Sequence, residues 1–209
     1  MYKNKYQRES KMMIENIPYL IAGLGNPSSK YRQNRHNVGF MVINVLAEEI
    51  NVPLRRVEFR AIIGKGEVES KRLILAKPQT YMNDSGQSVG PLVRFYRIPH
   101  NRLLVVHDDL DLPFGTLRLR PSGGTGGQKG MDSIVAQFGS QDFARLRVGI
   151  GRPPGRMDPR DYVLHDFDQP QQENLPFVLQ TAVEAILLFI NQGIEQAMNT
   201  FNGSVIEED

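Results

Sequence analysis

Hydrophobic and polar positions repeat along this chain with two periods, which predict alternating strands and helices. An apolar run from Tyr19 to the turn Gly25-Asn26-Pro27 has the length of a buried strand. Further strands are predicted at residues 59–68, 72–76, 103–106, 116–120 and 144–150. Helical spacing predicts helices at residues 38–50, 86–96 and 171–202, and one that ends at Phe138. This order favours an α/β fold: a single three-layer domain with a central mixed, mostly parallel sheet flanked by helices.

Length and composition limit the domain count and the cellular setting. The chain has 209 residues, of which 40% are apolar and 23% charged, enough for one core and short for two domains. We expect residues 1–18 to form a loose N-terminal extension and residues 19–205 the single domain. The absence of cysteine excludes thiol nucleophiles, disulfides and Cys-based zinc sites. No uninterrupted apolar run approaches membrane-spanning length, so we expect a cytoplasmic protein that binds no membrane.

Polar side chains lie at the predicted carboxyl ends of three strands. They include Asn26, Asn83 and Asp108, and His36 lies just before the first predicted helix, for which Asn37 is the expected N-cap. Ligands bind outside the carboxyl ends of strands in such sheets, so these four side chains are expected in one cleft. The positive end of the helix dipole would favour the neutral imidazole of His36.

These residue types suit hydrolysis of an acyl bond by activated water. A histidine beside a carboxylate can take a proton from water, and asparagine amides can donate to an oxyanion. Structural explanations also exist, because a single histidine or asparagine is often a cap or a surface residue. The run Asp108-Asp109-Leu110-Asp111 could be a solvated turn or a cation site, although it lacks the pattern of a calcium loop. The residues alone therefore indicate a hydrolytic or nucleotide-binding α/β domain.

Charge is balanced overall but basic in the middle of the chain. The net charge is only +2 and the isoelectric point is about 8.9. Arginines are frequent between Arg94 and Arg160, and the predicted strands at residues 116–120 and 144–150 each carry two arginines on one face. These arginines form either a basic face for nucleic acid or phosphate, or a scattered solvated surface.

Five motifs make the chain resemble bacterial-type peptidyl-tRNA hydrolases over roughly residues 19–200. Two are Gly23-Leu24-Gly25-Asn26-Pro27 followed by Arg35-His36-Asn37-Val38-Gly39, and Lys77-Pro78-Gln79-Thr80-Tyr81-Met82-Asn83-Asp84-Ser85-Gly86. The others are His107-Asp108-Asp109-Leu110-Asp111-Leu112-Pro113, Gly126-Gly127-Gln128-Lys129-Gly130 and Arg145-Leu146-Arg147-Val148-Gly149-Ile150-Gly151. The motifs occur in order and without large gaps, which makes chance similarity very improbable.

The resemblance implies a monomeric enzyme that cleaves the ester between a peptide and the 3′ ribose of tRNA, with peptidyl-tRNA as partner and without a metal or cofactor. It implies that His36 is the general base and Asp108 its orienting partner. Asn26 would separate substrates with a blocked amino group from free aminoacyl-tRNA, and Asn83 would contact the substrate near the ester. The implied binding residues are Tyr31 and Tyr81 in the cleft, Lys129, and Arg118 and Arg120 on a cationic strand.

Two positions depart from the family pattern. Ser28 replaces a usual glycine, and we expect it to take a conformation allowed to residues with a Cβ, while Gly25 permits positive φ in the turn. Gln128-Lys129 stands where many members have His-Asn, and that asparagine is implicated in binding tRNA and positioning water. Lysine keeps a donor but loses the amide acceptor, so Lys129 is expected to contact a phosphate or ribose.

Two alternatives stay open. One is a non-catalytic RNA-binding relative, because the same fold serves plant organelle intron splicing as a protein-partner module. Retention of His36, Asp108, Asn26 and Asn83 together speaks against this, since a binding module needs no base and no orienting carboxylate. The other is a hydrolase of another class, acting on nucleosides or peptides.

Overall fold

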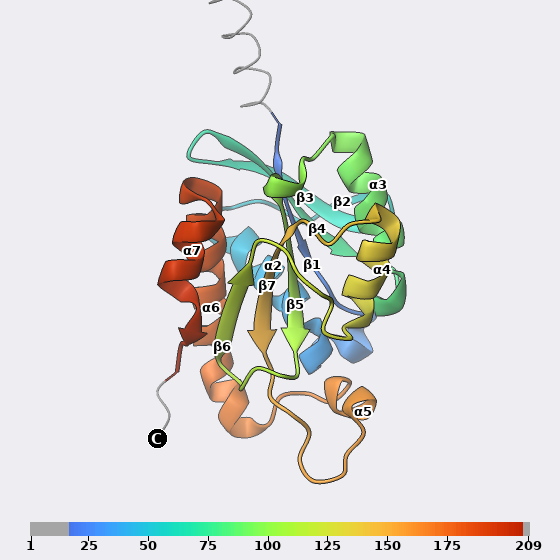
Figure 1. Ribbon diagram of the computed structural model, residues 1–209, viewed down its shortest axis with the longest axis vertical. Helices are drawn as coiled ribbons and strands as arrows, with labels where there is room; N and C mark the ends of the chain where they lie inside the picture. Colours follow the sequence, from blue (N-terminus) through green and yellow to red (C-terminus); the bar gives the residue numbers. More distant parts are fainter. Residues whose placement is uncertain (1–16, 207–209) are drawn as a thin grey trace, which may run out of the picture.

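A computed structural model describes residues 17–206 of the chain (Figure 1). Residues 1–16 and 207–209 lie outside the described residues, and the N-terminal extension predicted for residues 1–18 falls almost wholly among them. The described residues form one α/β domain with a single eight-stranded sheet.

The sheet is mixed, with a parallel centre. Its strand order is β2-β3-β4-β1-β5-β7-β6-β8. The strands are β1 Tyr19–Gly23, β2 Arg56–Glu58, β3 Ala61–Val68, β4 Lys71–Pro78, β5 Leu103–Asp109, β6 Thr116–Arg120, β7 Ala144–Gly149 and β8 Gly203–Ser204. The neighbours β4, β1, β5 and β7 run parallel, whereas the outer pairs are antiparallel. The carboxyl ends of β4, β1 and β5 therefore meet at one edge of the sheet.

Helices cover both faces of this sheet and make the expected three layers (Figure 1). The helices are α2 Val38–Glu49, α3 Gly86–Tyr96, α4 Lys129–Phe138, α5 Pro159–Val163, α6 Gln169–Gln192 and α7 Ile194–Phe201. Alternate residues of β1 feed the two cores: Ile21 packs with α2 and α6, whereas Leu20 and Ala22 pack with α3 and α4. Each strand of the parallel centre is buried on both sides, which explains its continuous apolar runs.

The predicted fold class is confirmed, with local differences of two kinds. Strand β5 extends to Asp109, so the polar residues predicted to follow it are hydrogen-bonded strand residues paired with β7. The short elements β2, β8 and α5 were not predicted, because two to five residues carry no measurable period. Helix α3 and strand β6 have the predicted bounds.

Helix α6 is long and apolar enough to cross a membrane by length and composition, with a mean hydropathy of 1.4 in its most apolar window. It is not an uninterrupted apolar run, because Gln180, Thr181 and Glu184 interrupt its apolar residues. The apolar side chains Val178, Ala182, Ile186 and Phe189 are buried in the core beside α2 and the sheet. The composition of α6 accordingly fits a core helix of the domain.

Candidate active site

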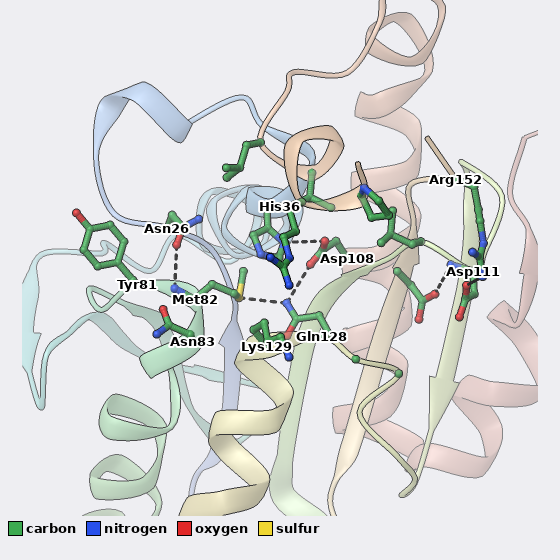
Figure 2. A pocket seen from close by; sticks show the side chains of 18 residues that line it. Asn26, His36, Tyr81, Met82, Asn83, Asp108, Asp111, Gln128, Lys129 and Arg152 are labelled. Atoms are coloured by element: carbon green, nitrogen blue, oxygen red, sulfur yellow. Dashed lines mark hydrogen bonds and ion pairs between the residues drawn. The ribbon is translucent and has the colours of Figure 1, made fainter. Parts of the chain in front are cut away.

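The four candidate residues from distant parts of the sequence lie in one cleft at the carboxyl edge of the sheet, as predicted. Asn26 follows β1, Asn83 follows β4, Asp108 lies at the end of β5, and His36 precedes α2. All four line a cavity of about 640 Å³, together with Tyr81, Met82, Gln128, Lys129 and residues of α5 (Figure 2).

His36 and Asp108 form a directed hydrogen bond. The Nδ1 atom of His36 lies 2.7 Å from Oδ2 of Asp108, and both side chains are largely buried. A carboxylate can only accept, so Nδ1 carries the proton and donates it to Asp108. The other ring nitrogen, Nε2, then has the free lone pair of a general base.

The charge of Asp108 decides the protonation of His36. Burial lowers the pKa of His36, but the Asp108 carboxylate and its hydrogen bond raise that pKa by more, so it lies above the ordinary 6.5. Burial raises the pKa of Asp108, but the charge of His36 and hydrogen bonds from His36 and Gln128 leave it below its ordinary value. The prediction that the helix N-terminus keeps the imidazole neutral was therefore incomplete, because the adjacent carboxylate favours the protonated form.

Arg35 fixes the segment that carries His36. Its guanidinium is buried and donates to the Asp166 carbonyl at 2.5 Å and to Gln171 Oε1 at 2.8 Å. Its Cζ atom lies 4.2 Å from the ring centroid of Tyr162 in α5. These contacts join the turn before α2 to the wall of the cleft that α5 forms.

Asn26 presents one end of its amide to the cleft. The backbone N–H of Met82 donates to Asn26 Oδ1 at 2.8 Å, which leaves Nδ2 as a donor (Figure 2). Asn37 holds the backbone of Asn26 on both sides, accepting from its N–H at 2.8 Å and donating to its carbonyl at 3.0 Å. Asn37 is the N-cap residue of α2, as predicted, but its side chain makes no cap bond to the helix, because the two bonds to Asn26 use it.

In the turn after β1, Ser28 has a positive φ and Gly25 does not, which is the reverse of what the sequence predicted. Ser28 has φ 112° and ψ 141°, a region used almost only by glycine, so it does not take an allowed conformation. Gly25 has no positive φ. A Cβ on Gly25 would lie 2.7 Å from the Phe40 ring, so glycine is needed there because of the close approach of α2.

The segment after β4 supplies the opposite wall of the cleft. Tyr81 and Asn83 are exposed at the cavity, and Met82 is buried beneath them. Ser85 is fully buried and donates from its hydroxyl to the Met82 carbonyl at 2.8 Å. This geometry makes Ser85 a structural residue of the segment after β4.

The sequence reasoning missed Gln128 as a contact of the His36–Asp108 pair. Its Nε2 atom donates to Asp108 Oδ1 at 3.0 Å, and its Oε1 atom accepts from the Met131 N–H at 2.8 Å (Figure 2). Gln128 is thus both the N-cap of α4 and a ligand of the buried carboxylate. Its place before a helix was visible in the sequence, but its contact with β5 was not.

Lys129 lines the cavity as the first residue of α4. Its side chain is exposed, and Nζ lies 3.4 Å from Asp132 Oδ2, one turn along the same helix. This is a weak surface pair, so the ammonium can reach an anionic ligand at little cost.

The glycine-rich segment is held by Arg145 beneath it. Arg145 is almost fully buried and donates to the carbonyls of Gly123, Gly124, Gln141 and Phe143. Burial, with a smaller effect of Arg147, lowers the pKa of Arg145 to about 10. Arg145 therefore supports the loop, and it does not belong to an exposed basic face as its position on the strand suggested.

The acidic run at the end of β5 does not converge on one point. Asp109 pairs with Arg147, Asp111 pairs with Arg152, and Asp108 pairs with His36. Each carboxylate thus has its own partner: an arginine for Asp109 and for Asp111, and for Asp108 the His36 imidazole, which is charged only when protonated. The run therefore forms separate pairs around the cleft.

Arg118 and Arg120 lie on β6, outside the residues that line the cavity. Arg118 is opposite Arg147, and Arg120 is opposite Arg145, across the antiparallel pair. Among residues 17–206 neither Arg118 nor Arg120 forms an ion pair. Tyr31, also predicted for the cleft, is half-buried in the turn Ser29–Tyr31 and is not among the lining residues.

Comparisons with known proteins match most of this chain to one family. A family model described as peptidyl-tRNA hydrolase matches residues 20–209. A chloroplastic peptidyl-tRNA hydrolase of Arabidopsis thaliana is 50% identical over 187 residues, which cover 89% of this chain and 65% of that protein. A peptidyl-tRNA hydrolase of Frankia casuarinae is 45% identical over 185 residues, with 88% and 94% covered. The crystal structure of the Acinetobacter baumannii peptidyl-tRNA hydrolase superimposes with a TM-score of 0.83 at 37% identity, covering 88% and 96%.

Proposed function

Because this chain belongs to the peptidyl-tRNA hydrolase family, as its sequence motifs predicted, we propose that it releases peptide and tRNA by ester hydrolysis with His36 as the general base. The hydrogen bond between His36 Nδ1 and Asp108 Oδ2 is the observation that carries this proposal. The substrate is a tRNA whose aminoacyl group is blocked at its amino end by a peptide or another acyl group.

The reaction follows from the orientation of the imidazole. His36 Nε2 takes a proton from water while the water oxygen attacks the ester carbonyl carbon. Asp108 stabilises the imidazolium that forms and keeps Nδ1 protonated. The tetrahedral intermediate then expels the 3′ oxygen of the ribose, which receives the proton from Nε2. The products are a peptide with a free carboxyl group and a tRNA with a free 3′ hydroxyl.

Asn26 selects the blocked substrate by its free amide donor. Its Oδ1 is used by Met82, so Nδ2 meets the substrate. A peptide carbonyl accepts from this donor, whereas the ammonium of a free aminoacyl-tRNA only donates and leaves Nδ2 without a partner. Asn83, at the opposite wall, donates to the carbonyl oxygen near the ester as negative charge develops on it.

The tRNA is held by charge that does not depend on sequence. Among residues 17–206 neither Arg118 nor Arg120 is paired with a carboxylate, and Lys129 lies at the cleft beside the exposed Asp132. Phosphate contacts from these three side chains give affinity for any tRNA body. Tyr81 is exposed beside Asn83 and offers a ring face to the terminal nucleotide or the peptide.

The proposal needs one copy of the chain and no cofactor. The base, the carboxylate and both amides come from one chain, and they supply proton transfer and carbonyl polarisation themselves. The apolar side of α6 is covered by the core, in keeping with a protein that binds no membrane. The cytoplasmic location stays a prediction, since the Arabidopsis relative is named as chloroplastic.

A non-catalytic RNA-binding protein is the alternative that the fold permits. It predicts RNA binding without turnover, and it gives no reason for a buried histidine with a dedicated carboxylate. Incubation with N-acetyl-aminoacyl-tRNA separates the two functions. We expect release of free tRNA by the wild-type chain and none by His36→Ala, with unblocked aminoacyl-tRNA left intact. RNA binding without any release by the wild-type chain would contradict the hydrolase.

A further inference from the structure

We infer that Gln128 is a positioning residue that orients the Asp108 carboxylate toward His36, an inference that rests on the proposed function. Asp108 is buried, and its two oxygens have different partners: His36 Nδ1 at Oδ2 and Gln128 Nε2 at Oδ1. The carboxylate is therefore held between the base and the N-terminus of α4.

The orientation of the Gln128 amide is fixed by the helix that it caps. The Met131 N–H is a donor and lies 2.8 Å from Oε1, so the oxygen must face α4 and the NH₂ group must face Asp108. The same Nε2 lies 3.1 Å from the sulfur of Met82, across the cleft floor. A Cβ on Gly130 would lie 2.7 Å from that sulfur and 3.1 Å from Gln128 Oε1, so glycine leaves room for this arrangement.

The hydrogen bond from Gln128 Nε2 to Asp108 Oδ1 favours the ionised form of Asp108 throughout the neutral pH range. An amide does not titrate near neutral pH, and its NH₂ group can only donate to the carboxylate. Loss of the donor would leave Oδ1 of a buried charge without a partner, which should lower the equilibrium population of the aligned, ionised pair by about 10- to 100-fold. The carboxylate would also be free to rotate away from the geometry that serves His36.

A Gln128→Glu variant separates this role from helix capping. The carboxylate keeps an acceptor for the Met131 N–H, and negative charge is favourable at a helix N-terminus. It loses the donor, however, and places a second carboxylate next to Asp108, so the two groups must share a proton. We expect substrate KM to change little, and thermal stability to stay close to wild type at acidic pH, where the two carboxylates keep the shared proton. We expect kcat to be reduced about tenfold or more at pH 8, with the loss growing as pH rises.

The matched control is Gln180→Glu on α6. Gln180 Nε2 also donates to a carboxylate, Glu49 Oε2 at 2.8 Å, but this pair lies outside the cleft. The control should keep the wild-type pH profile. A second variant, Gln128→Leu, removes donor and cap together, and its effect is measured without substrate. The NMR resonance of the His36 Nδ1 proton should shift or broaden in Gln128→Leu and stay unchanged in Gln180→Glu.

The outcomes distinguish the positioning role of Gln128 from the hydrolase activity itself. A wild-type chain that hydrolyses blocked aminoacyl-tRNA, with the altered pH profile in Gln128→Glu and the altered resonance in Gln128→Leu, supports the inference. A wild-type profile in Gln128→Glu, or an unmoved His36 resonance in Gln128→Leu, overturns the positioning role while the hydrolase stands. No hydrolysis by the wild-type chain overturns the proposed function itself, and the resonance then still reports whether Gln128 orients the pair.

Discussion

His36 Nδ1 lies 2.7 Å from Asp108 Oδ2, although 72 positions separate the two residues in the sequence. The contact exists because β5 lies next to β1 in the sheet, and because His36 lies just before α2, which begins at the carboxyl edge of the sheet. It sets the tautomer of His36, and the pH dependence of the site follows from it.

Removal of the base should abolish turnover with little loss of binding. His36→Ala takes away the group that accepts the water proton, so we expect kcat to fall about 10²- to 10⁴-fold. Single-turnover release of tRNA measures the rate, and filter binding measures affinity. His165→Ala, at an exposed histidine, is the control and should keep its rate. Near-normal turnover in His36→Ala would remove this residue from the mechanism.

The pH profile should reveal the carboxylate behind the base. His36 is neutral only above its raised pKa, so kcat/KM of the wild-type chain should rise with pH through a value above 6.5. In Asp108→Asn the carboxylate that raises the pKa of His36 is gone, and burial, which lowers this pKa, remains. The rising limb of the kcat/KM profile should therefore move to lower pH. The plateau should fall about 10²- to 10⁴-fold, because an amide can bind the wrong tautomer. A limb that stays in place would show that another group titrates.

Asn26→Asp should impair selection while the loop keeps its shape. The carboxylate still accepts from the Met82 N–H, but the donor toward the substrate is lost. We expect kcat/KM for N-acetyl-aminoacyl-tRNA to fall about tenfold or more. Unblocked aminoacyl-tRNA is the comparison, and its slow reaction should change much less. Equal loss for both substrates would indicate a general effect on the cleft.

Arginines on β6 should set the salt dependence of tRNA binding. Each phosphate contact contributes about one unit to the slope of log affinity against log salt. Arg118→Gln and Arg120→Gln together should therefore flatten the slope by about two, and Lys129→Ala by about one. Arg72→Gln is the control, because Arg72 is exposed on β4, which β1, β5 and β7 separate from β6 in the sheet. An unchanged slope in the variant with both Arg118→Gln and Arg120→Gln would show that the tRNA binds to another face of the protein.

Ser28→Gly should stabilise the domain. The φ of 112° at Ser28 costs a residue with a Cβ about 1–3 kcal/mol, whereas glycine takes it freely. Glycine also makes the unfolded chain more flexible, which lowers the free energy of unfolding by about 0.5–1 kcal/mol. We therefore expect a net gain of about 1 kcal/mol in the free energy of unfolding. Denaturant titration measures it. Ser29→Gly, at a neighbour without positive φ, should not stabilise; a gain at both positions would contradict the strain at Ser28.

The sequence alone determined the fold class and the identity of the four polar residues that meet in the cleft. Buried parallel strands are continuous apolar runs, and helices repeat with a longer period, so β1, β6, α2 and α3 were visible from local pattern. The polar residues at strand ends could be assigned to one cleft because the carboxyl ends of parallel strands share an edge. Asn26, His36, Asn83 and Asp108 follow from that rule.

Only the tertiary structure decided how these residues divide their hydrogen bonds. Asn37 is the N-cap residue of α2, but its side chain holds the backbone of Asn26. Arg145 looked like a surface cation but supports the glycine-rich loop. Gln128 contacts Asp108 across twenty positions of sequence. Each of these bonds depends on which donor and acceptor the packed chain brings within about 3 Å, and no periodic pattern in the sequence encodes that distance.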